Sequence, residues 1–307
     1  MKRCEILIPG HYFCDVIFTG IPGFPALGTE IYTENLTVVP GGCLNTVTAL
    51  RRLGADVGWM GAIGNDLFSR FIDDWITQEK IARDWLTYHE EPFQRVTVAL
   101  SYPQDRAFVS YVSVTPDQLD EVRRAVAADE CEHLHFTGLN VDPRVPDLLR
   151  ICRQRGIVVS MDCQHRTETL DSPHVREVLG LLDMFMPNAG EAMRLTGTTT
   201  VEDAAHLLRE LVPLLVIKDG ANGAQAWQGD LHVQAPALKV EVVDTTGAGD
   251  VFNAGFLAAY RAGNDLLTCL RWGNIGGGLS TTGYGGCSTA PTRAIIETYL
   301  RQIEGEI

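Results

Sequence analysis

Short apolar runs alternate with segments of helical periodicity along most of the chain. The apolar runs, rich in β-branched residues, have the length of strands and lie at residues 4–10, 57–64, 133–138, 156–163, 184–188 and 214–220. Between them, apolar residues recur every three or four positions, as in amphipathic helices, at 45–55, 66–79, 145–156 and 201–211. Apolar strands that alternate with helices are typical of a parallel sheet covered on both faces. The pattern therefore predicts an α/β fold, and because no linker or repeat divides the chain, we expect a single domain over residues 1–307.

Two regions break this alternation. Residues 93–102 and 106–114 are strand-like and are separated by the turn-prone sequence Pro-Gln-Asp at 103–105, which predicts an antiparallel hairpin. The glycine- and proline-rich stretch 15–42 also contains strand-like segments. We expect the stretch 15–42 and the hairpin to pair as a small β-sheet that lies beside the main sheet as a lid.

The composition excludes several classes of partner. The chain has 45% hydrophobic and 21% charged residues, as in an ordinary soluble globular protein, and a net charge of −14 with no block of basic residues. Non-specific binding to nucleic acid or to an anionic membrane requires a positive surface, so neither is expected. The eight cysteines lack the spacing of metal sites, and we find neither a signal peptide nor a run of about 20 apolar residues. We therefore expect free, buried thiols and a cytoplasmic protein.

The stretch VVDTTGAGDVFNAGF, residues 242–256, carries the clearest chemical signal. We predict a strand at 239–244 and a helix at 250–263, so the turn between them lies at the carboxyl end of the sheet, where open α/β folds bind ligands. The Gly-Ala-Gly sequence at 247–249 offers backbone N–H groups with little side-chain obstruction at the positive end of the helix. This arrangement predicts an anion hole suited to a phosphoryl group.

Two other phosphate-binding motifs do not fit this chain. The sequence contains no GxxxxGK[ST], which excludes a P-loop, and the turn does not match GxGxxG because Phe252 stands at the third glycine position. Asp250 follows the turn at the predicted helix start. A carboxylate there could act as a catalytic base or could only favour the helix dipole, and the residue alone leaves both roles open.

The complete stretch resembles the second signature of the ribokinase-like (PfkB) family of carbohydrate kinases, DTxGAGD followed by xFxxGF. The matching residues are Asp244, Thr246, Gly247, Ala248, Gly249, Asp250, Phe252, Gly255 and Phe256. The resemblance implies a three-layer α/β/α fold with a mostly parallel central sheet. It also implies that Asp250 takes the proton from the acceptor hydroxyl while the 247–249 turn steadies the transferring phosphoryl group. A carboxylate suits this role because phosphoryl transfer gains most from positioning and charge stabilisation.

The family's first signature, a glycine pair followed by an asparagine at a helix start, is similar to residues 40–55, although the glycine turn is one residue shorter here. The resemblance implies an acceptor site formed by Asp15, Gly41, Gly42 and Asn45, with Phe13 and Arg106 as further candidates. Asn45 could also merely cap its helix, and Arg106 could be a solvated residue at the hairpin tip. Phe13 stands where ribokinases carry asparagine, and its ring could stack on a sugar or on a base.

Later segments resemble the nucleotide side of the family. Residues 187–197 are similar to its NxxE segment, 217–224 to its nucleotide loop, 272–286 to its adenine-side segment and 162–166 to its DxNxR segment. The resemblance implies that ATP is bound by Asn188, Lys218, Gly220, Gly223 and Asn274. Lys218 could alternatively be an ordinary surface charge.

Two cations are also implied by the resemblance. It places a hydrated Mg²⁺ near Glu191, and carboxylate oxygens with water are the ligands that this ion prefers. It places a K⁺ beside the anion hole, held by oxygens of Asp244, Thr246 and the 281–287 region.

These residues predict an ATP-dependent sugar kinase that transfers the γ-phosphoryl group of ATP to a hydroxymethyl group of a sugar. A nucleoside kinase of the same family is the alternative enzyme. A sugar-binding regulator without catalysis is the alternative of a different class, and the intact Asp250 and its turn argue against it. The residues do not name the sugar.

The predicted hairpin implies a partner as well. Val96, Val98, Leu100, Phe108 and Tyr111 supply its apolar positions. An isolated hairpin is only marginally stable in water, so one face must be buried. The resemblance suggests the lid of a second subunit, and we expect a homodimer joined through this sheet.

Overall fold

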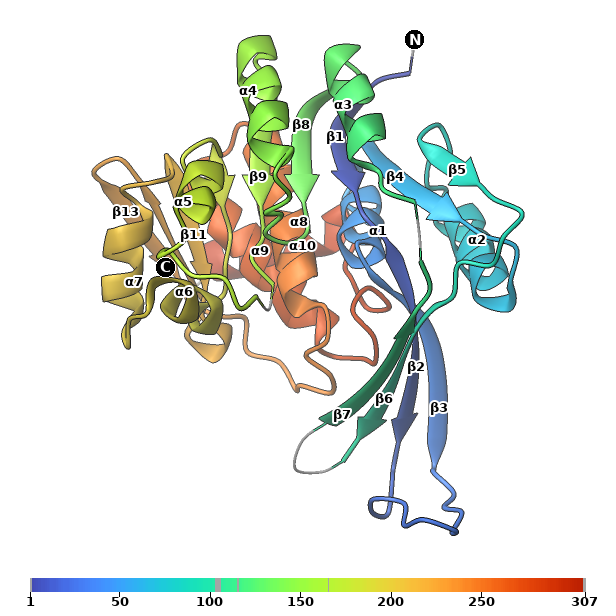
Figure 1. The fold of residues 1–307 in the computed structure, drawn as a ribbon. Helices are drawn as coiled ribbons and strands as arrows, with labels where there is room; N and C mark the ends of the chain where they lie inside the picture. Colours follow the sequence, from blue (N-terminus) through green and yellow to red (C-terminus); the bar gives the residue numbers. More distant parts are fainter. Residues whose placement is uncertain (1, 103–105, 115, 165, 306–307) are drawn as a thin grey trace.

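A large and a small β-sheet meet at one edge of the molecule (Figure 1). The structure, a computed structural model, describes residues 2–102, 106–114, 116–164 and 166–305. Within these residues, nine strands form the large sheet in the order β13-β12-β11-β10-β9-β8-β1-β4-β5. Their bounds are β1 Cys4–Pro9, β4 Val57–Ile63, β5 Leu86–Tyr88, β8 Cys131–Phe136, β9 Val158–Met161, β10 Met184–Phe185, β11 Leu214–Lys218, β12 Ala224–Gln228 and β13 Leu231–Ala235. The pairs from β5 to β11 are parallel, and only β12 and β13 add antiparallel pairs in the described chain.

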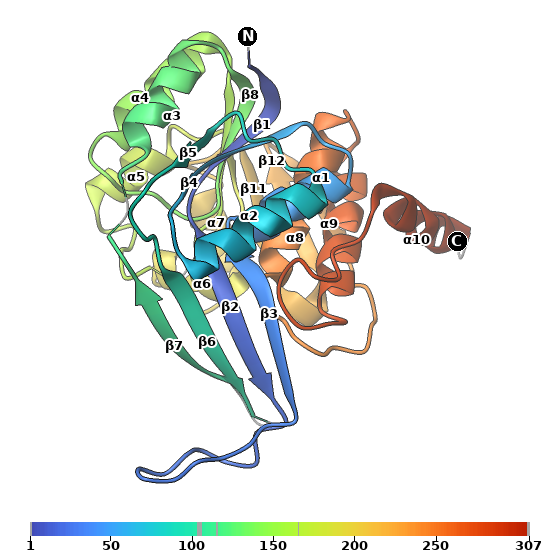
Figure 2. The same cartoon turned by 90° about the vertical axis from the view of Figure 1, so that its right-hand side faces the viewer.

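Helices cover both faces of the large sheet, which confirms the predicted three-layer α/β/α architecture (Figures 1 and 2). One face packs against α1 (Leu44–Arg52), α2 (Leu67–Glu79), α8 (Ala248–Arg261), α9 (Leu266–Ser280) and α10 (Arg293–Gly305). The other packs against α3 (Leu119–Ala127), α4 (Val145–Arg155), α5 (Pro173–Leu179), α6 (Ala189–Thr196) and α7 (Val201–Leu208). In β1, Ile6 and Ile8 enter the first core and Leu7 enters the second. The inner strands are largely apolar because they supply both cores.

The small sheet extends away from the body of the molecule (Figure 2). It consists of β3 (Asn35–Gly42), β2 (Tyr12–Thr19), β6 (Arg95–Ser101) and β7 (Arg106–Val112), in that order. The expected pairing of the N-terminal stretch with the hairpin is confirmed, because β2 pairs with β6 in parallel. The predicted turn at 103–105 lies outside the described residues.

The two faces of the small sheet differ in chemistry. Asp15 pairs with Thr97, and Thr97 pairs with Ser110, so these polar side chains share the face toward the body. Phe108 pairs with Ala99 on the same face, whereas Tyr111, which we grouped with it among the apolar positions of the hairpin, lies on the opposite face. The register is the reason, since side chains an odd number of residues apart point to opposite faces of a strand.

One predicted strand is wrong. Residues 239–244 belong to no strand: Val242 and Val243 are 58% and 45% exposed, and only Asp244 of this group of three is buried. The preceding strand β13 is already the edge of the sheet, so the run continues as an extended loop, and the N–H groups of Val243 and Asp244 donate to Thr281 O at 2.8 and 3.1 Å. In the part of the chain that is described, no helix is long and apolar enough to cross a membrane.

Candidate active site

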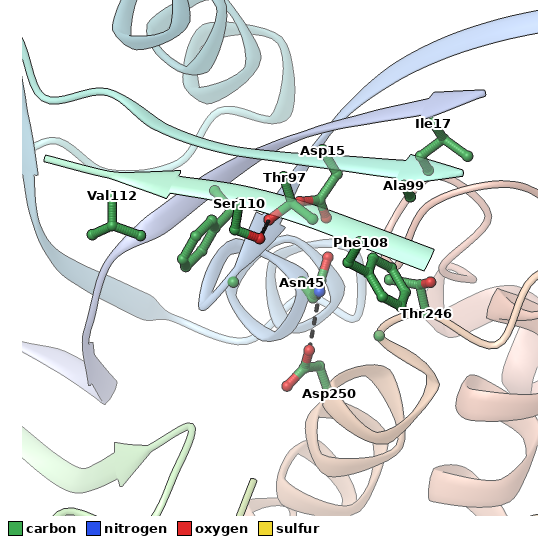
Figure 3. A pocket seen from close by; sticks show the side chains of 13 residues that line it. Asp15, Ile17, Asn45, Thr97, Ala99, Phe108, Ser110, Val112, Thr246 and Asp250 are labelled. Atoms are coloured by element: carbon green, nitrogen blue, oxygen red, sulfur yellow. Dashed lines mark hydrogen bonds between the residues drawn. The ribbon is translucent and has the colours of Figure 1, made fainter. Parts of the chain in front are cut away.

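A cavity of about 330 Å³ lies between the small sheet and the start of α8 (Figure 3). It is lined by Phe13, Asp15, Ile17, Gly42, Asn45, Thr97, Ala99, Phe108, Ser110, Val112, Thr246, Gly247 and Asp250. The fold thus brings together most of the residues predicted for the acceptor and the anion hole, although Asn45 and Asp250 are 205 positions apart in the sequence. Of the other predicted acceptor residues, Gly41 lies beside Asp15, while the side chain of Arg106, at the first position of β7, is outside the description.

The Gly-Ala-Gly turn forms the beginning of α8. Gly247 is the N-cap, with a φ of 69° that favours glycine, and a Cβ at this position would lie 2.5 Å from the Cα of Gly286. In the described residues no side chain caps the helix. The N–H of Ala248 bonds to Thr245 O at 3.3 Å, so this group is engaged within the turn. The predicted anion hole would therefore consist of the remaining N–H groups of the first turn and the helix dipole.

Asp250 lies in the first turn of α8 and faces Asn45 at the start of α1 (Figure 3). Asn45 Nδ2 donates to Asp250 Oδ2 at 3.0 Å. Burial raises the pKa of Asp250 to about 7, the hydrogen bond from Asn45 lowers it, and the charge of Asp162 raises it further. A carboxyl group with this pKa can accept a proton near neutral pH. Asn45 is only 3% exposed, and within the described chain its Oδ1 accepts no hydrogen bond. The alternative role of Asn45 as a helix cap is wrong, because Cys43 is the N-cap of α1 and no side chain caps this helix in the described residues.

Asp15 sits on β2, opposite the start of α8. Burial, and secondly the charge of Asp244, raise the pKa of Asp15 to about 7. A Cβ at Gly41 would lie 2.1 Å from Asp15 Oδ2, so only glycine admits the carboxylate at this point of β3. Gly42, with a φ of 64°, lines the cavity itself. The two glycines of the shortened turn therefore have different roles: Gly41 leaves room for the carboxylate of Asp15, and Gly42 borders the cavity.

Much of the cavity wall is apolar. Phe13 lines it, and so do Val112 on one side and Phe108 with Ile17 on another (Figure 3). The guanidinium of Arg95 lies 5.8 Å from the centre of the Phe13 ring. The expected aromatic candidate thus borders the cavity, and Phe108 adds a second ring that the sequence did not assign to the site.

The loop before α8 and the loop after α9 are joined at Asp244. Asp244 Oδ1 accepts from the N–H and the hydroxyl of Thr246 at 2.9 and 2.8 Å, and Oδ2 accepts from the N–H of Gly285 at 3.0 Å. Gly286 approaches the amide of Asn45 so closely that a Cβ would lie 2.5 Å from Oδ1. The residues predicted to hold a monovalent cation therefore lie on two adjoining loops beside the anion hole.

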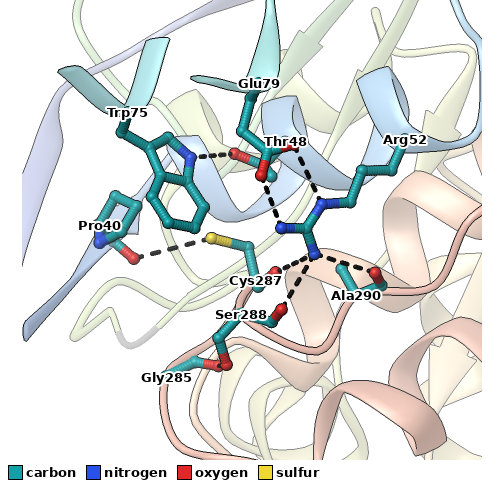
Figure 4. Close-up of polar contacts among 9 residues, drawn as sticks. All are labelled: Pro40, Thr48, Arg52, Trp75, Glu79, Gly285, Cys287, Ser288 and Ala290. Atoms are coloured by element: carbon teal, nitrogen blue, oxygen red, sulfur yellow. Dashed lines mark hydrogen bonds and ion pairs between the residues drawn. The ribbon is translucent and has the colours of Figure 1, made fainter. Parts of the chain in front are cut away.

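The side chain of Arg52 binds the loop that follows α9 (Figure 4). Its Nη1 donates to the carbonyl oxygens of Cys287, Ser288 and Ala290 at 2.8, 3.1 and 3.0 Å. Its Nε and Nη2 bind the carboxylate of Glu79 at 3.1 and 2.6 Å. The last residues of α1 and α2 thus fix a loop that borders the site.

On the nucleotide side, Asn188 and Glu191 form a capping box at the start of α6. Asn188 Oδ1 accepts from Glu191 N at 2.9 Å, and Glu191 Oε2 accepts from Asn188 N at 2.8 Å. Burial, and then the charge of Asp162, raise the pKa of Glu191. The pair predicted for nucleotide and Mg²⁺ is thus also a helix cap, which fixes the carboxylate in position.

Lys218 is not a surface charge, since it is only 9% exposed. Its ammonium donates to Asp162 Oδ2 at 2.7 Å and to Asn253 Oδ1 at 3.3 Å. A Cβ at Gly249 would lie 3.4 Å from Lys218 Nζ. The ammonium of Lys218 therefore lies close to Gly249, at the glycine end of the predicted anion hole.

The remaining nucleotide-side candidates shape the backbone. Gly220 and Gly223 have φ of 51° and 92°, and a Cβ at Gly223 would lie 2.1 Å from Ala235 O. Asn274 Nδ2 donates to Ala235 O and Pro236 O at 2.9 and 3.0 Å. Asn274 thus anchors the chain after β13, and this use occupies its amide donors.

Several residues of this region escaped the sequence reasoning. Thr97 and Ser110 line the cavity and share a hydrogen bond of 3.1 Å across β6 and β7 (Figure 3). Strand alternation through the hairpin was the signal that could have placed them beside Asp15. Asn253 lies three positions after Asp250, and helical spacing could have placed both on one face of α8. Arg52 gave no comparable signal.

Known proteins resemble this chain over most of its length. The family model "pfkB family carbohydrate kinase" matches residues 22–293. The chain is 27% identical over 306 residues to the ribokinase of Bacillus subtilis, covering 96% of this chain and 99% of the relative. It is 27% identical over 259 residues to the cytidine kinase of Thermococcus kodakarensis, covering 82% and 91%. The structure of Arabidopsis thaliana ribokinase complexed with ribose and ATP matches with a TM-score of 0.81 at 21% identity, covering 98% of this chain and 99% of that one. The chain belongs to the pfkB family of carbohydrate kinases, phosphotransferases with an alcohol group as acceptor.

Proposed function

We propose that this protein transfers the γ-phosphoryl group of ATP to a hydroxymethyl group of a sugar bound in the cavity under the small sheet. The observation that carries the proposal is the position of Asp250. Its carboxyl group borders the cavity, lies in the first turn of an uncapped helix and has a pKa of about 7. A base and a phosphoryl-binding helix terminus are thereby placed at the same point. The ribokinase relative supports a sugar as acceptor.

The chain's own residues supply most of the chemistry. The acceptor hydroxyl gives its proton to the carboxylate of Asp250 as the oxygen attacks phosphorus, and the first turn of α8 stabilises the negative charge on the phosphoryl oxygens. Asp15 and the unpartnered Oδ1 of Asn45 accept hydrogen bonds from other hydroxyls of the sugar. The small sheet acts as the lid of the single domain and excludes water, which would otherwise compete for the phosphoryl group.

The nucleotide lies on the side of Asn188, Glu191 and Lys218. In the described residues no group of three or more His, Cys, Asp or Glu side chains could hold a metal ion by itself. This fits Mg²⁺, which keeps most of its water and is bound through one or two carboxylates and the substrate phosphates, here near Glu191. When bound, the ion neutralises charge on the phosphates.

Asp244 and Thr246 with the 281–287 loop would hold a monovalent cation, which we take to be K⁺. The support for the site is the closeness of the two loops, joined by the hydrogen bond from Gly285 N to Asp244 Oδ2. Oxygen atoms from two adjoining loops are suited to such an ion. It would add fixed positive charge near the anion hole.

A nucleoside is the second candidate acceptor, and the apolar wall of the cavity favours it. Phe13, Ile17, Phe108 and Val112 offer surfaces for a base, whereas a sugar alone offers few apolar groups to them. The cytidine kinase relative supports the same reading. A regulator without catalysis is disfavoured because the hydrogen-bonded Asp250 retains the geometry of a base.

We also propose a homodimer joined through the outer face of the small sheet. This face presents Leu36, Val109 and Tyr111, which are 58%, 65% and 60% exposed, beside Val98 on the same side of β6. Contiguous apolar surface on a sheet face typically marks an interface. The eight cysteines are all free and buried, which supports a reducing compartment, the cytoplasm.

The function is tested by coupled ADP release with pentoses, hexoses, sugar acids, phosphosugars and nucleosides, with and without K⁺. We expect release that depends on one acceptor class, with a phosphorylated product identified by mass spectrometry. The matched control is Asp250→Asn, which removes the base at constant volume. ADP release that no acceptor increases, or that the control retains in full, contradicts the proposal.

A further inference from the structure

Behind the anion hole lies a buried polar cluster formed by Lys218, Asp162 and Asn253. Lys218 ends β11, Asp162 follows β9, and Asn253 lies in α8, one turn after Asp250. The side chains of Lys218 and Asp162 are 10% and 7% exposed, and Asn253 is wholly buried. The cluster therefore joins the sheet to the helix that carries the proposed base.

The contacts within the cluster use both ends of the asparagine amide. Asn253 Nδ2 donates to Asp162 Oδ2 at 2.6 Å, and Asn253 Oδ1 accepts from Lys218 Nζ at 3.3 Å. The same Asp162 oxygen accepts from Lys218 Nζ at 2.7 Å, while its other oxygen accepts from Cys163 N at 2.7 Å. An aspartate at 253 would lack the donor, and a leucine would lack both groups.

The residues around Asn253 argue against the view that its amide serves only the helix in which it lies. Its neighbours in α8, Phe252 and Ala254, are buried and apolar, and burying an amide among such residues is costly unless it forms hydrogen bonds. An apolar residue would continue the helix at less cost. The amide is therefore explained by what it holds, namely the Lys218 ammonium.

We propose that Asn253, together with Asp162, is a positioning residue that holds the Lys218 ammonium against the glycine end of the anion hole for contact with the transferring phosphoryl group. The inference rests on the proposed kinase function. A free lysine side chain samples many rotamers, and two fixed acceptors remove this freedom before the substrate binds. An ammonium has three donors, and the described contacts use two of them, so the third is left for a phosphate oxygen.

The charges around Asp250 give a second readout. Asp162, Lys218 and Glu191 all act on its ionisation, from the end of β9, β11 and α6. The Lys218 charge lowers the pKa of Asp250, and the Asp162 charge raises it. A lysine released from its acceptors would lie farther from this carboxylate on average. The pKa of Asp250 would then rise. The acid limb of the pH–rate profile, which is the part below neutrality where the rate increases with pH, should therefore move to higher pH.

The test compares Asn253→Ala, Lys218→Met and the double variant with wild-type protein. We expect Asn253→Ala to lower kcat by about tenfold to a hundredfold, as for the loss of hydrogen bonds to a charged group, while the KM of the acceptor stays within about twofold. Lys218→Met should lower kcat at least as much. The double variant should match Lys218→Met, because Asn253 acts only through the ammonium. The acid limb of Asn253→Ala should lie at higher pH than that of wild type.

Two further proteins keep the test decisive. Asn264→Ala is the matched control, since Asn264 lies just beyond the end of α8 and its Nδ2 donates only to Ala259 O, at 2.9 Å, among the described contacts. It should lose stability without losing kcat. Asn253→Ser keeps a polar group in less volume and serves if Asn253→Ala does not fold.

Failure of the inference can be told apart from failure of the proposed function. If wild-type protein phosphorylates an acceptor and a folded position-253 variant keeps its kcat, or if the losses in the double variant add, the inference is wrong and the kinase stands. If no acceptor is phosphorylated, the binding of a non-hydrolysable ATP analogue is measured by calorimetry. Equal, non-additive losses of affinity in Asn253→Ala and Lys218→Met then support the inference, and unchanged affinity overturns it.

Discussion

The ionisation of Asp250 gives the sharpest test of its role as base. Its carboxyl group has a pKa raised to about 7, chiefly by burial. A base accepts a proton only when it is ionised, so about half of the enzyme is competent at pH 7, about a tenth at pH 6 and about a hundredth at pH 5. From the ionisation of Asp250 alone, we expect kcat/KM for the acceptor to rise about tenfold between pH 5 and 6, about fivefold between pH 6 and 7, and to level off near pH 8. The assay is coupled ADP release at constant ionic strength.

Variants separate Asp250 from its neighbours. Asp15 has a similar raised pKa, so the profile is repeated in Asp15→Asn, where a limb of tenfold per unit should remain. Asn45→Ala removes a hydrogen bond to the carboxylate, whose usual value of about 1.5–3 kcal/mol corresponds to a shift of the limb by about 1–2 units to higher pH. Asp250→Asn should lower turnover by about 10²–10⁴ while acceptor and ATP still bind. A flat profile between pH 5 and 8 in Asp15→Asn, or near-normal turnover of Asp250→Asn, would refute the reasoning.

Four other changes test the geometry. Gly249→Val should abolish most turnover without unfolding, because the side chain would enter the space between the turn and the Lys218 ammonium; a folded, fully active variant contradicts the anion hole. Asp15→Ala should raise the acceptor KM far more than the ATP KM in initial-rate kinetics, and equal effects would indicate general destabilisation. Arg52→Met should lower the free energy of unfolding by about 3–5 kcal/mol in a denaturant titration, since it leaves three carbonyls and Glu79 without their partner, whereas the neighbouring exposed Arg51→Met should change it by less than about 1 kcal/mol. Sedimentation should show a wild-type dimer and a Val98→Lys monomer; an active wild-type monomer at micromolar concentration would show that the lid closes within one chain.

The main sheet was predictable because buried parallel strands leave an unambiguous pattern. In β11, for example, Leu214 and Val216 enter one core and Leu215 and Ile217 the other, so the strand is apolar at every position before Lys218. The run at 239–244 contains three valines, which favour extended backbone, but it lacks a neighbouring strand. Composition reports the preference of a segment for extended backbone and does not report whether a partner strand is available.

The edge strands β12 and β13 could not be predicted, because they lack the apolar pattern of buried strands. β12 and β13 contain alanine, glutamine and histidine, and Leu231 is 51% exposed. A strand that contributes little to a core leaves no strong apolar pattern. The small sheet could be predicted because apolar residues alternate with small or polar ones along its hairpin. The face on which Phe108 lies could be assigned only from the strand register in the structure.

The site was predictable only where its residues are contiguous or match a known signature. The 244–256 stretch carries the turn, the base and the helix in order. Lys218 lies 56 positions after Asp162 in the sequence, and Asn253 lies 91 positions after it. Each of these residues alone resembles an ordinary polar residue. Their association follows from the strand order, which places the ends of β9 and β11 on either side of β10 at the carboxyl edge of the sheet. No local pattern contains that order.

The electrostatics of the site follow from these placements. The chain has a net charge of −14, and Asp15, Asp162, Glu191 and Asp250 add carboxyl groups around a region proposed to bind polyphosphate. A diffuse positive field therefore does not attract the nucleotide; fixed, directional donors must hold it. The start of α8 supplies N–H groups, and Lys218 supplies a cation whose position is set by hydrogen bonds. Burial, and then the charges of Asp162 and Glu191, raise the pKa of Asp250 toward neutrality, so carboxylates that oppose phosphate binding also help to make the proposed base effective.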